Sequence, residues 1–342
     1  MKLLPNLTWT PRLKIHKKMA QLNYPYGVFV SNDEVFIADT LNYRVRKLLR
    51  NGQIVTIAGN GIRGYDGDGQ LATNAQLYYP TSVIVSSADQ VYIADGKRIR
   101  KIDRNGIIST IAGTVNVEYN GDDQLAVHAN MFVTADEEFL IADSENDRVR
   151  KIDRFGIITT VAGNGTKGYN GDGQLATTAQ LFHPLGVFQH KHEIYISDHG
   201  NCRIRKIDRN GIISTIVGPD IINDPTLLFV HNGELYFTQY ELCKAQLNGT
   251  ITTIRSEFNR GINDDCMGML NFPVGIFVED SHIYIADTNN NCIRRIDQED
   301  GKMRTIVGTE QRVMFHLISI SIHILGHGRN QKSNHFQLLT MT

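Results

Sequence analysis

Short apolar runs recur along the chain at intervals of roughly fifty residues, and nearly all of them end in Asp. The first run, Val35 to Asp39, reads VFIAD. Self-similarity at a period of twenty to fifty residues is typical of one supersecondary unit that is stacked many times. The pattern therefore predicts a repeat architecture. The other copies are 91–95, 139–143, 194–198 and 283–287, with a weaker sixth copy at 235–239.

The unit from residue 24 to 59 indicates what one repeat contains. Two apolar runs, 27–30 and 35–38, flank a polar turn, as in a β-hairpin. After a polar loop, residues 44–48 alternate polar and apolar side chains, and residues 54–58 form a further β-branched run. A period of two predicts strands. Each unit therefore predicts four antiparallel strands, here called a to d, joined as a meander.

A glycine marks the turn between strands c and d in every unit. We expect two-residue hairpin loops there, because these loops need a positive φ that Gly or Asn adopts with little steric cost. The six turns are Asn51-Gly52, Asn105-Gly106, Phe155-Gly156, Asn210-Gly211, Asn248-Gly249 and Asp300-Gly301.

Four antiparallel strands repeated six times, with no helical pattern between the copies, predict an all-β, six-bladed β-propeller. We expect an N-terminal extension at 1–23, one propeller domain at 24–308 and an atypical tail at 309–342. Since one contiguous unit can supply all four strands of a blade, we expect the ring to close without strand exchange between its ends. The predicted blades span about 24–59, 79–113, 130–163, 183–218, 224–254 and 272–308.

Two kinds of stretch give the chain a family resemblance. Residues 37–47 and 141–153 resemble the NHL repeat, and the glycine-rich stretch 160–176 is similar to the form found in teneurin-type and many bacterial NHL proteins. The likeness covers about residues 20–308. It implies an NHL/TolB-like propeller that serves as a platform for protein, or sometimes RNA, ligands. Fold by itself does not establish function.

Two blades depart from this pattern. In blade three, Met131 stands where a Pro opens most units, and the a–b turn reads as trimmed. In blade five, Gln239 replaces the Asp, and residues 241–244 replace the Arg-rich strand.

Composition is that of an ordinary folded domain: 41% of the 342 residues are apolar and the formal net charge is −1. Net charge therefore does not favour nucleic acid as a partner. Neither a signal peptide nor an apolar segment long enough to span a membrane is visible, which favours a cytoplasmic location. The four cysteines, without a CxxC pair, disfavour a zinc knuckle or a disulfide scaffold: Cys202, Cys243, Cys266 and Cys292.

The Asp that ends strand b and the Arg that opens strand c predict a structural pair. The hairpin places them opposite each other, where a charge-assisted hydrogen bond can form. The Asn between them is expected to bond its own backbone and set the turn. The pairs are Asp39 with Arg44, Asp143 with Arg148 and Asp198 with Arg203.

Several motifs allow a chemical as well as a structural interpretation. The Arg/Lys stripes of strand c would suit phosphates, but Asp follows them directly and no aromatic residues are interleaved, so RNA is disfavoured. The GxGxxG matches at 59–64 and 163–168 lack the following helix of a dinucleotide site. Turn formation explains the glycine-flanked carboxylates better than calcium does, because no distal Glu follows: Asp66, Asp68, Asp122 and Asp172.

The channel of a propeller could also hold a metal-dependent lactonase or amidating-lyase site. The openings of the inner strands offer only Asn130, His183 and Asp224 as scattered polar candidates, without a converging ligand set. The sequence therefore predicts no enzyme, no catalytic residue and no cofactor.

Loops on a rigid scaffold are the usual place for binding residues, so we expect a protein ligand on the face that carries the long d–a and b–c loops. The tyrosines of these loops have a second interpretation, which is packing of each loop onto its blade. The candidate contact residues are Arg63, Tyr65, Tyr78, Tyr119, Lys167 and Tyr169.

Overall fold

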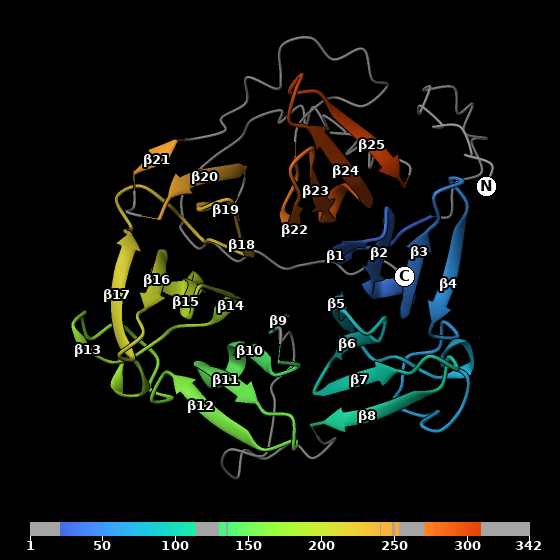
Figure 1. Ribbon diagram of the computed structural model, residues 1–342, viewed down its shortest axis with the longest axis horizontal. Helices are drawn as coiled ribbons and strands as arrows, with labels where there is room; N and C mark the ends of the chain where they lie inside the picture. The colour runs from blue at the N-terminus through green and yellow to red at the C-terminus, as the bar shows by residue number, and fades with distance from the viewer. Residues whose placement is uncertain are drawn as a thin grey trace, which may run out of the picture. The chain divides into compact units, whose positions relative to one another are not determined.

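A computed structural model describes residues 21–113, 130–134, 136–239, 241–247, 250–252 and 270–308. Its strands form six antiparallel sheets of consecutive strands arranged around a central axis (Figure 1). The prediction of an all-β, six-bladed propeller with four-stranded blades is thereby confirmed.

Blades one to three contain twelve strands. Blade one is β1 (Pro25–Ser31), β2 (Glu34–Asp39), β3 (Arg44–Leu48) and β4 (Ile54–Ala58). Blade two is β5 (Pro80–Val85), β6 (Val91–Asp95), β7 (Arg98–Ile102) and β8 (Ile108–Ala112). Blade three is β9 (Asn130–Val133), β10 (Phe139–Asp143), β11 (Arg148–Ile152) and β12 (Ile158–Ala162).

Blades four to six follow the same order. Blade four is β14 (Pro184–His190), β15 (Glu193–Asp198), β16 (Arg203–Ile207) and β17 (Ile212–Val217). Blade five is β18 (Leu228–His231), β19 (Glu234–Thr238), β20 (Leu242–Gln246) and β21 (Ile251–Thr252). Blade six is β22 (Pro273–Val278), β23 (His282–Asp287), β24 (Cys292–Asp297) and β25 (Met303–Val307).

Short 3₁₀ turns lie in the b–c and d–a connections of the described chain. In four blades the b–c turn ends on a residue with φ between 50° and 54°, which reverses the chain after strand b. The turns are η1 (Thr40–Asn42), η2 (Ala72–Asn74), η3 (Ser144–Asn146), η4 (Ala176–Thr178), η5 (His199–Asn201) and η7 (Thr288–Asn290).

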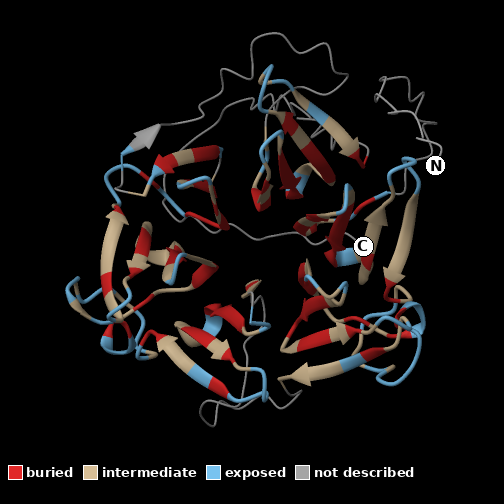
Figure 2. Cartoon of the chain, in the orientation of Figure 1, coloured by how far each residue is buried: buried red, intermediate tan, exposed pale blue. Residues whose placement is uncertain are grey.

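The hydrophobic core lies between neighbouring blades, because each sheet buries both of its faces. Each of six clusters joins one adjacent pair of blades, including the pair formed by blades six and one. Buried residues concentrate on the inner strands, whereas the outermost strands are mostly half-buried (Figure 2). The inner strands are therefore the rigid part of the scaffold.

Two long d–a loops contribute to this core and also cover the edge of the following blade. Residues 70–72 bond to the outer strand β8, and β13 (Gln174–Leu175) pairs with β17. The next residues of each loop, Ala75 and Ala179 among them, are buried between the blades. An uncovered strand edge is a template for aggregation, so this pairing protects blades two and four.

Blade three has a different register from the one expected. Met131 pairs with Ile141, as Val28 pairs with Ile37 in blade one, so Met131 does not occupy the Pro position. The a–b turn runs from Thr134 to Glu138 and is one residue longer than that of blade one, rather than trimmed. The predicted alignment placed Met131 at the Pro25 position, whereas Met131 corresponds to Val28, three residues further along strand a.

The c–d turns are also wider than expected. In blade one, the Leu49 amide donates to the Gln53 carbonyl and the Gly52 amide donates to the Leu49 carbonyl, so the loop has three residues. Gly52 has a φ of 81°, and Asn51 keeps a negative φ. This is a type I turn followed by a left-handed glycine, which needs positive φ at one residue instead of two.

The ring closes without strand exchange, as expected. The buried hydroxyl of Thr288 in blade six donates to the Pro25 carbonyl of blade one at 2.8 Å. The same bond joins blade one to blade two through Thr40 and Pro80, and blade three to blade four through Ser144 and Pro184. One repeated inter-blade hydrogen bond therefore also serves as the closing contact.

We predict that Thr288→Val lowers the free energy of unfolding by about 1 kcal/mol, because the Pro25 carbonyl loses this donor in a buried place. Urea denaturation measures the loss. Thr40→Val removes the equivalent bond and should cost a similar amount. The exposed Thr73→Val is the control and should stay within about 0.5 kcal/mol of the wild type. If Thr288→Val is as stable as the wild type, the Thr288 hydrogen bond does not help to close the ring.

Candidate functional site

The Asp that ends strand b is fully buried in five blades. In four of them one carboxylate oxygen accepts the backbone N–H of the residue two positions before strand a; for Asp39 the donor is Asn23, at 2.8 Å. In blade five, the Gln239 side chain accepts the equivalent N–H from Asn223 at 3.2 Å. The replacement of Asp by Gln therefore preserves this contact.

The predicted Arg partner of this Asp was wrong by two residues. Asp39 and Arg44 are cross-strand neighbours, but the ion pair of Asp39 is with Arg46 at 3.1 Å. Asp39 has φ −88° and ψ 73°, outside the extended region, so its carboxylate is turned away from the residue opposite. The corresponding pairs are Asp95–Arg100 at 3.6 Å, Asp143–Arg150 at 3.9 Å, Asp198–Arg205 at 3.2 Å and Asp287–Arg294 at 2.9 Å.

The loop Asn also has a role different from the one predicted. The Asn42 amide donates to both carboxylate oxygens of Asp39 at 2.9 Å, rather than bonding its own backbone. Asn146 binds Asp143 in the same way, and Asn201 and Asn290 each donate to Oδ2 of their Asp. This carboxylate therefore holds the b–c loop, strand c and the start of strand a together.

The first Arg of strand c holds backbone carbonyls of the loops. Arg44 donates to Asn42 and Asn60, and Arg148 donates to Asn146 and Asn164. A Cβ at Gly61 would lie 2.3 Å from the Arg44 guanidinium, and Gly165 is equally close to Arg148. These glycines of the GxGxxG matches therefore make room for an arginine.

Two of the loop carboxylates considered for calcium bind buried arginines. Asp68 meets Arg100 at 2.7 Å and Asp172 meets Arg205 at 2.9 Å, and both guanidinium groups are fully buried. Partial burial raises the pKa of Asp68, but the nearby Thr110 and the Arg100 charge outweigh it, and the pKa is lowered. Asp66 is exposed, and Asp122 lies outside the described residues.

Blade two leaves its buried Asp incompletely satisfied. Its b–c connection is too short to supply the Asn of the other blades, and Asp95 Oδ2 has no hydrogen-bond partner among the described residues. Burial raises the pKa of Asp95 to about 7, although backbone hydrogen bonds from Tyr78 and Tyr79 and the Arg100 charge oppose the rise.

Three of the predicted contact residues meet in one group on the loop face. Arg63 is exposed and lies 4.1 Å from the Tyr78 ring centre and 4.5 Å from that of Tyr79. Tyr65 stacks on Tyr78 with ring centres 4.6 Å apart. Tyr43 of the b–c loop meets Tyr79 edge-on, and Arg98 lies over Tyr65. We call Tyr43, Arg63, Tyr65, Tyr78, Tyr79 and Arg98 the Arg63 cluster.

A second group, the Lys167 cluster, occupies the equivalent loop between blades three and four. The Lys167 ammonium lies 3.9 Å from the Phe182 ring centre, and the Arg203 guanidinium lies 3.8 Å from that of Tyr169. Lys167 and Tyr169 are exposed. Tyr119, the third predicted loop tyrosine, lies outside the described residues.

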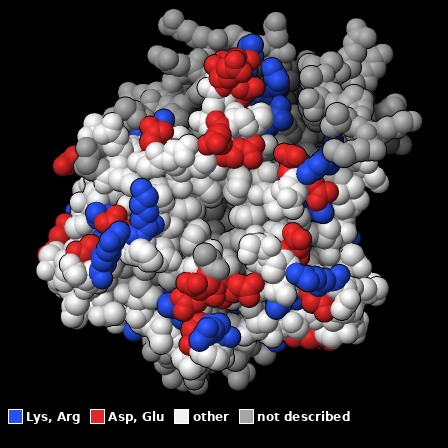
Figure 3. All heavy atoms as spheres, viewed as in Figure 1, with Lys and Arg blue, Asp and Glu red and all other residues white. Residues whose placement is uncertain are grey.

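The basic stripes of strand c are largely neutralised. Beyond the buried Arg–Asp pairs, the Lys that follows in strand c pairs with the Glu near the start of strand b, as in Lys206 with Glu193 at 3.1 Å and Lys151 with Glu138 at 2.6 Å. Asp153 and Asp208 accept backbone N–H groups of the c–d turns. Basic and acidic side chains accordingly lie side by side on the face in Figure 3.

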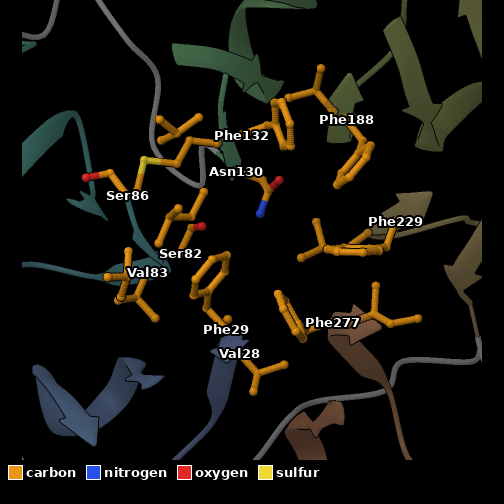
Figure 4. A pocket seen from close by; sticks show the side chains of 18 of the residues that line it. Val28, Phe29, Ser82, Val83, Ser86, Asn130, Phe132, Phe188, Phe229 and Phe277 are labelled. Carbon is orange, nitrogen blue, oxygen red and sulfur yellow. The ribbon is translucent and has the colours of Figure 1, made fainter. Parts of the chain in front are cut away.

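The inner strands surround a cavity of about 350 Å³ in the central channel (Figure 4). Of the three polar channel candidates, only Asn130 is among the described residues that line it. Glu137 is the one titratable side chain of that lining. His183 and Asp224 precede strands a with φ of 50° and 47°. The described residues contain no group of three or more His, Cys, Asp or Glu placed to hold a metal ion.

Two features of these sites were not predicted from the sequence. Tyr43, Tyr79, Arg98 and Phe182 were not identified as members of the loop clusters, because their partners lie on other loops and strands. The channel-facing Phe of strand a was also missed, although it recurs one or two residues before the a–b turn in five units. That recurrence was a usable signal.

Sequence relatives agree with this architecture. A family profile described as the Teneurin NHL domain matches residues 63–134 and 164–239. Teneurin-3 of Danio rerio is 35% identical over 94 residues, which cover 24% of this chain and 4% of that protein. Teneurin-m of Drosophila melanogaster is 37% identical over 94 residues, which cover 25% of this chain and 3% of that protein. The chain thus corresponds to a small part of the length of these relatives.

Solved structures agree in fold at low identity. A gluconolactonase from Xanthomonas campestris aligns with a TM-score of 0.57 and 13% identity over 84% of this chain and 88% of that one. A streptogramin B lyase aligns with a TM-score of 0.55 and 15% identity, and the alignment covers 85% of each chain. A chain of a nidogen/laminin complex aligns with a TM-score of 0.54 and 13% identity, and the alignment covers 80% of this chain and 92% of that one. The solved structures agree with the propeller fold, and the family profile, the teneurin relatives and the six blades together support an NHL-repeat β-propeller.

Within the part of the chain that the structure describes, no helix has the length and apolar character needed to cross a membrane.

We predict that Asp95 makes the protein less stable as pH rises from about 4 to about 7. The folded-state pKa lies above the usual Asp value, so the folded protein holds the proton more tightly than the unfolded chain. The contribution of Asp95 to the free energy of unfolding falls by at most about 1.4 kcal/mol per pH unit. Asp95→Asn should therefore exceed the wild type in unfolding free energy at pH 8, by a margin that vanishes near pH 4.

Urea denaturation at both pH values measures that margin. Asp287→Asn is the matched control, because Asp287 is bound by Asn290 and Arg294 and its replacement should destabilise the protein at pH 8. A loss of stability at pH 8 for Asp95→Asn as well would contradict the assignment.

We further predict that Asp172→Ala lowers the unfolding free energy by about 1–2 kcal/mol, because buried Arg205 loses one charged partner while Asp198 remains. Asp66→Ala, at an exposed position of the equivalent loop, should be near neutral. Millimolar calcium should leave the wild-type melting temperature unchanged. A calcium-induced rise that disappears in Asp172→Ala would instead establish a calcium site.

Proposed function

We propose that this propeller is a non-catalytic binding module that holds a protein ligand on its loop face, the surface formed by the d–a and b–c loops. The observation that carries the proposal is the Arg63 cluster. Its exposed guanidinium is fixed over two tyrosine rings, on a loop whose other end is buried between blades.

The physical argument rests on preorganisation. Tyr and Arg are enriched among the residues that dominate protein–protein binding energy. A side chain that is already held in place loses less entropy when it binds. Arg63 also donates a hydrogen bond to the Tyr78 hydroxyl, and Tyr65 stacks on that tyrosine. The cluster therefore offers cationic and aromatic contact area in one geometry.

The Lys167 cluster supports a second contact point of similar chemistry. Lys167 over Phe182 and Arg203 over Tyr169 repeat the arrangement of a cation on a ring. The loop between blades one and two and the loop between blades three and four thus carry clusters of similar chemistry. Two such contact points suit an extended protein surface better than a small molecule.

Two other classes of function are weaker on these observations. For RNA, most of the strand c cations of the described blades are occupied by Asp or Glu, which reduces the charge available for phosphates. For a lyase or lactonase, as in two structural neighbours, the described lining of the channel offers one carboxylate. A chain of similar fold from a nidogen/laminin complex gives a precedent for protein binding on this fold.

We predict that Arg63→Ala and Lys167→Ala each weaken capture of a protein ligand at least tenfold, since truncation at a binding hot spot costs 1–2 kcal/mol or more. The assay is pull-down with the purified propeller, identification of bound proteins by mass spectrometry, and titration of the identified ligand. Both variants should keep the wild-type melting temperature, because both side chains are exposed.

Arg50→Ala is the matched control, because Arg50 is an exposed arginine on the a–b and c–d turn face of blade one. It should bind as the wild type does. Equal binding by all three variants would exclude the loop face. Capture that is abolished by ribonuclease would replace the protein ligand with RNA.

A further inference from the structure

Five phenylalanines and one isoleucine form a collar around the central channel. They occupy the same register position of strand a in all six blades, and each is half-buried. The collar residues are Phe29, Ile84, Phe132, Phe188, Phe229 and Phe277.

The rings of the collar contact one another in sequence. Ring centres are 4.5 Å apart between Phe132 and Phe188, 4.7 Å between Phe188 and Phe229, 5.1 Å between Phe229 and Phe277, and 5.0 Å between Phe277 and Phe29. Phe277 meets both Phe229 and Phe29 edge-to-face, an arrangement that aromatic pairs prefer, and the other two pairs are tilted by 50° and 52°. The collar is therefore an ordered apolar wall.

Several polar side chains also line this largely apolar space, and Asn130 is the one amide among the described lining residues. The Asn130 amide points into the cavity from blade three (Figure 4), and it has no hydrogen-bond partner among the described residues. The equivalent positions of three other blades are glycines whose backbone lies against the next blade: Gly27, Gly186 and Gly275. In blade two this position is Ser82, which also lines the cavity.

The Asn130 amide is half-buried and accessible to water in the channel, so a ligand that bonds to it must match the hydrogen bonds that water makes there. Most cavities of this kind in proteins that bind small molecules have apolar walls and a few polar groups that orient the ligand. At about 350 Å³, the cavity is near the lower limit for such sites. Asn can both donate and accept, so it suits an amide, carbonyl or hydroxyl group.

We propose that the channel binds a small, uncharged aromatic or aliphatic molecule whose single amide, carbonyl or hydroxyl group is hydrogen-bonded by Asn130. The apolar part of the molecule packs against the collar. An anionic ligand is disfavoured, because Glu137 is the one titratable side chain of the described lining. This site is separate from the loop face, so either proposal can fail without the other.

The probes are benzamide, which has a ring and an amide, and toluene, which has a ring alone. Benzamide should bind the wild-type protein with a dissociation constant of about 1 mM, as expected for so few atoms. Ligand-observed NMR measures the affinity. With ¹³C-labelled phenylalanine, benzamide should shift collar resonances and leave that of Phe155, an exposed residue of a c–d turn, unchanged.

Three variants test the assignment. Asn130→Leu should weaken benzamide roughly tenfold and leave toluene unaffected, because one hydrogen bond is lost. Ile84→Trp fills the channel and should abolish binding of both probes. Phe155→Ala removes a phenylalanine outside the collar and should bind both as the wild type does.

Absence of saturable benzamide binding to the folded wild type would overturn the proposal, as would unchanged binding by a folded Ile84→Trp. Equal losses of benzamide and toluene in Asn130→Leu would overturn the role of the amide. If Ile84→Trp fails to fold, the phenylalanine shifts of the wild type decide the location, and shifts confined to residues outside the collar contradict it.

Discussion

The ion pair between the buried Asp that ends strand b and the second Arg of strand c connects nearly every part of a blade. Its carboxylate accepts the backbone before strand a, binds the b–c loop through Asn, and faces a guanidinium that is almost fully buried in four blades. Two charges removed from water are unfavourable unless their hydrogen bonds are satisfied. The loops of the folded chain therefore supply hydrogen-bond partners for these buried charges.

The position of the long d–a loops follows from this requirement. Asp68 and Asp172 extend from the loops to Arg100 and Arg205, and adjacent loop residues pair with the outer strand of the same blade. The end of each loop is buried between blades. The glycine-rich segments are thus held at three places, and the exposed Arg63 and Lys167 clusters lie on a fixed support.

The channel obeys a different constraint. Strand a of each blade must approach the neighbouring blade closely, as at Gly27, where a Cβ would lie 2.7 Å from the Thr81 carbonyl oxygen. Large side chains are accommodated further along the strand, and there they converge as the collar. Asn130 is larger than its glycine counterparts and projects into the space that remains.

The sequence by itself determined the number of blades, their strands and the glycine turns, because period-two patterning and turn glycines act locally. It also located Arg63, Tyr65 and Tyr78 on one loop. The slipped register at Met131 and the shifted partner of Asp39 show the limit of local rules, since a shifted register or one non-extended dihedral angle changes which side chains meet. Only the tertiary structure decided that Arg63 lies over Tyr79 and that five phenylalanines form a collar, because closing the ring brings together residues that are distant in the chain.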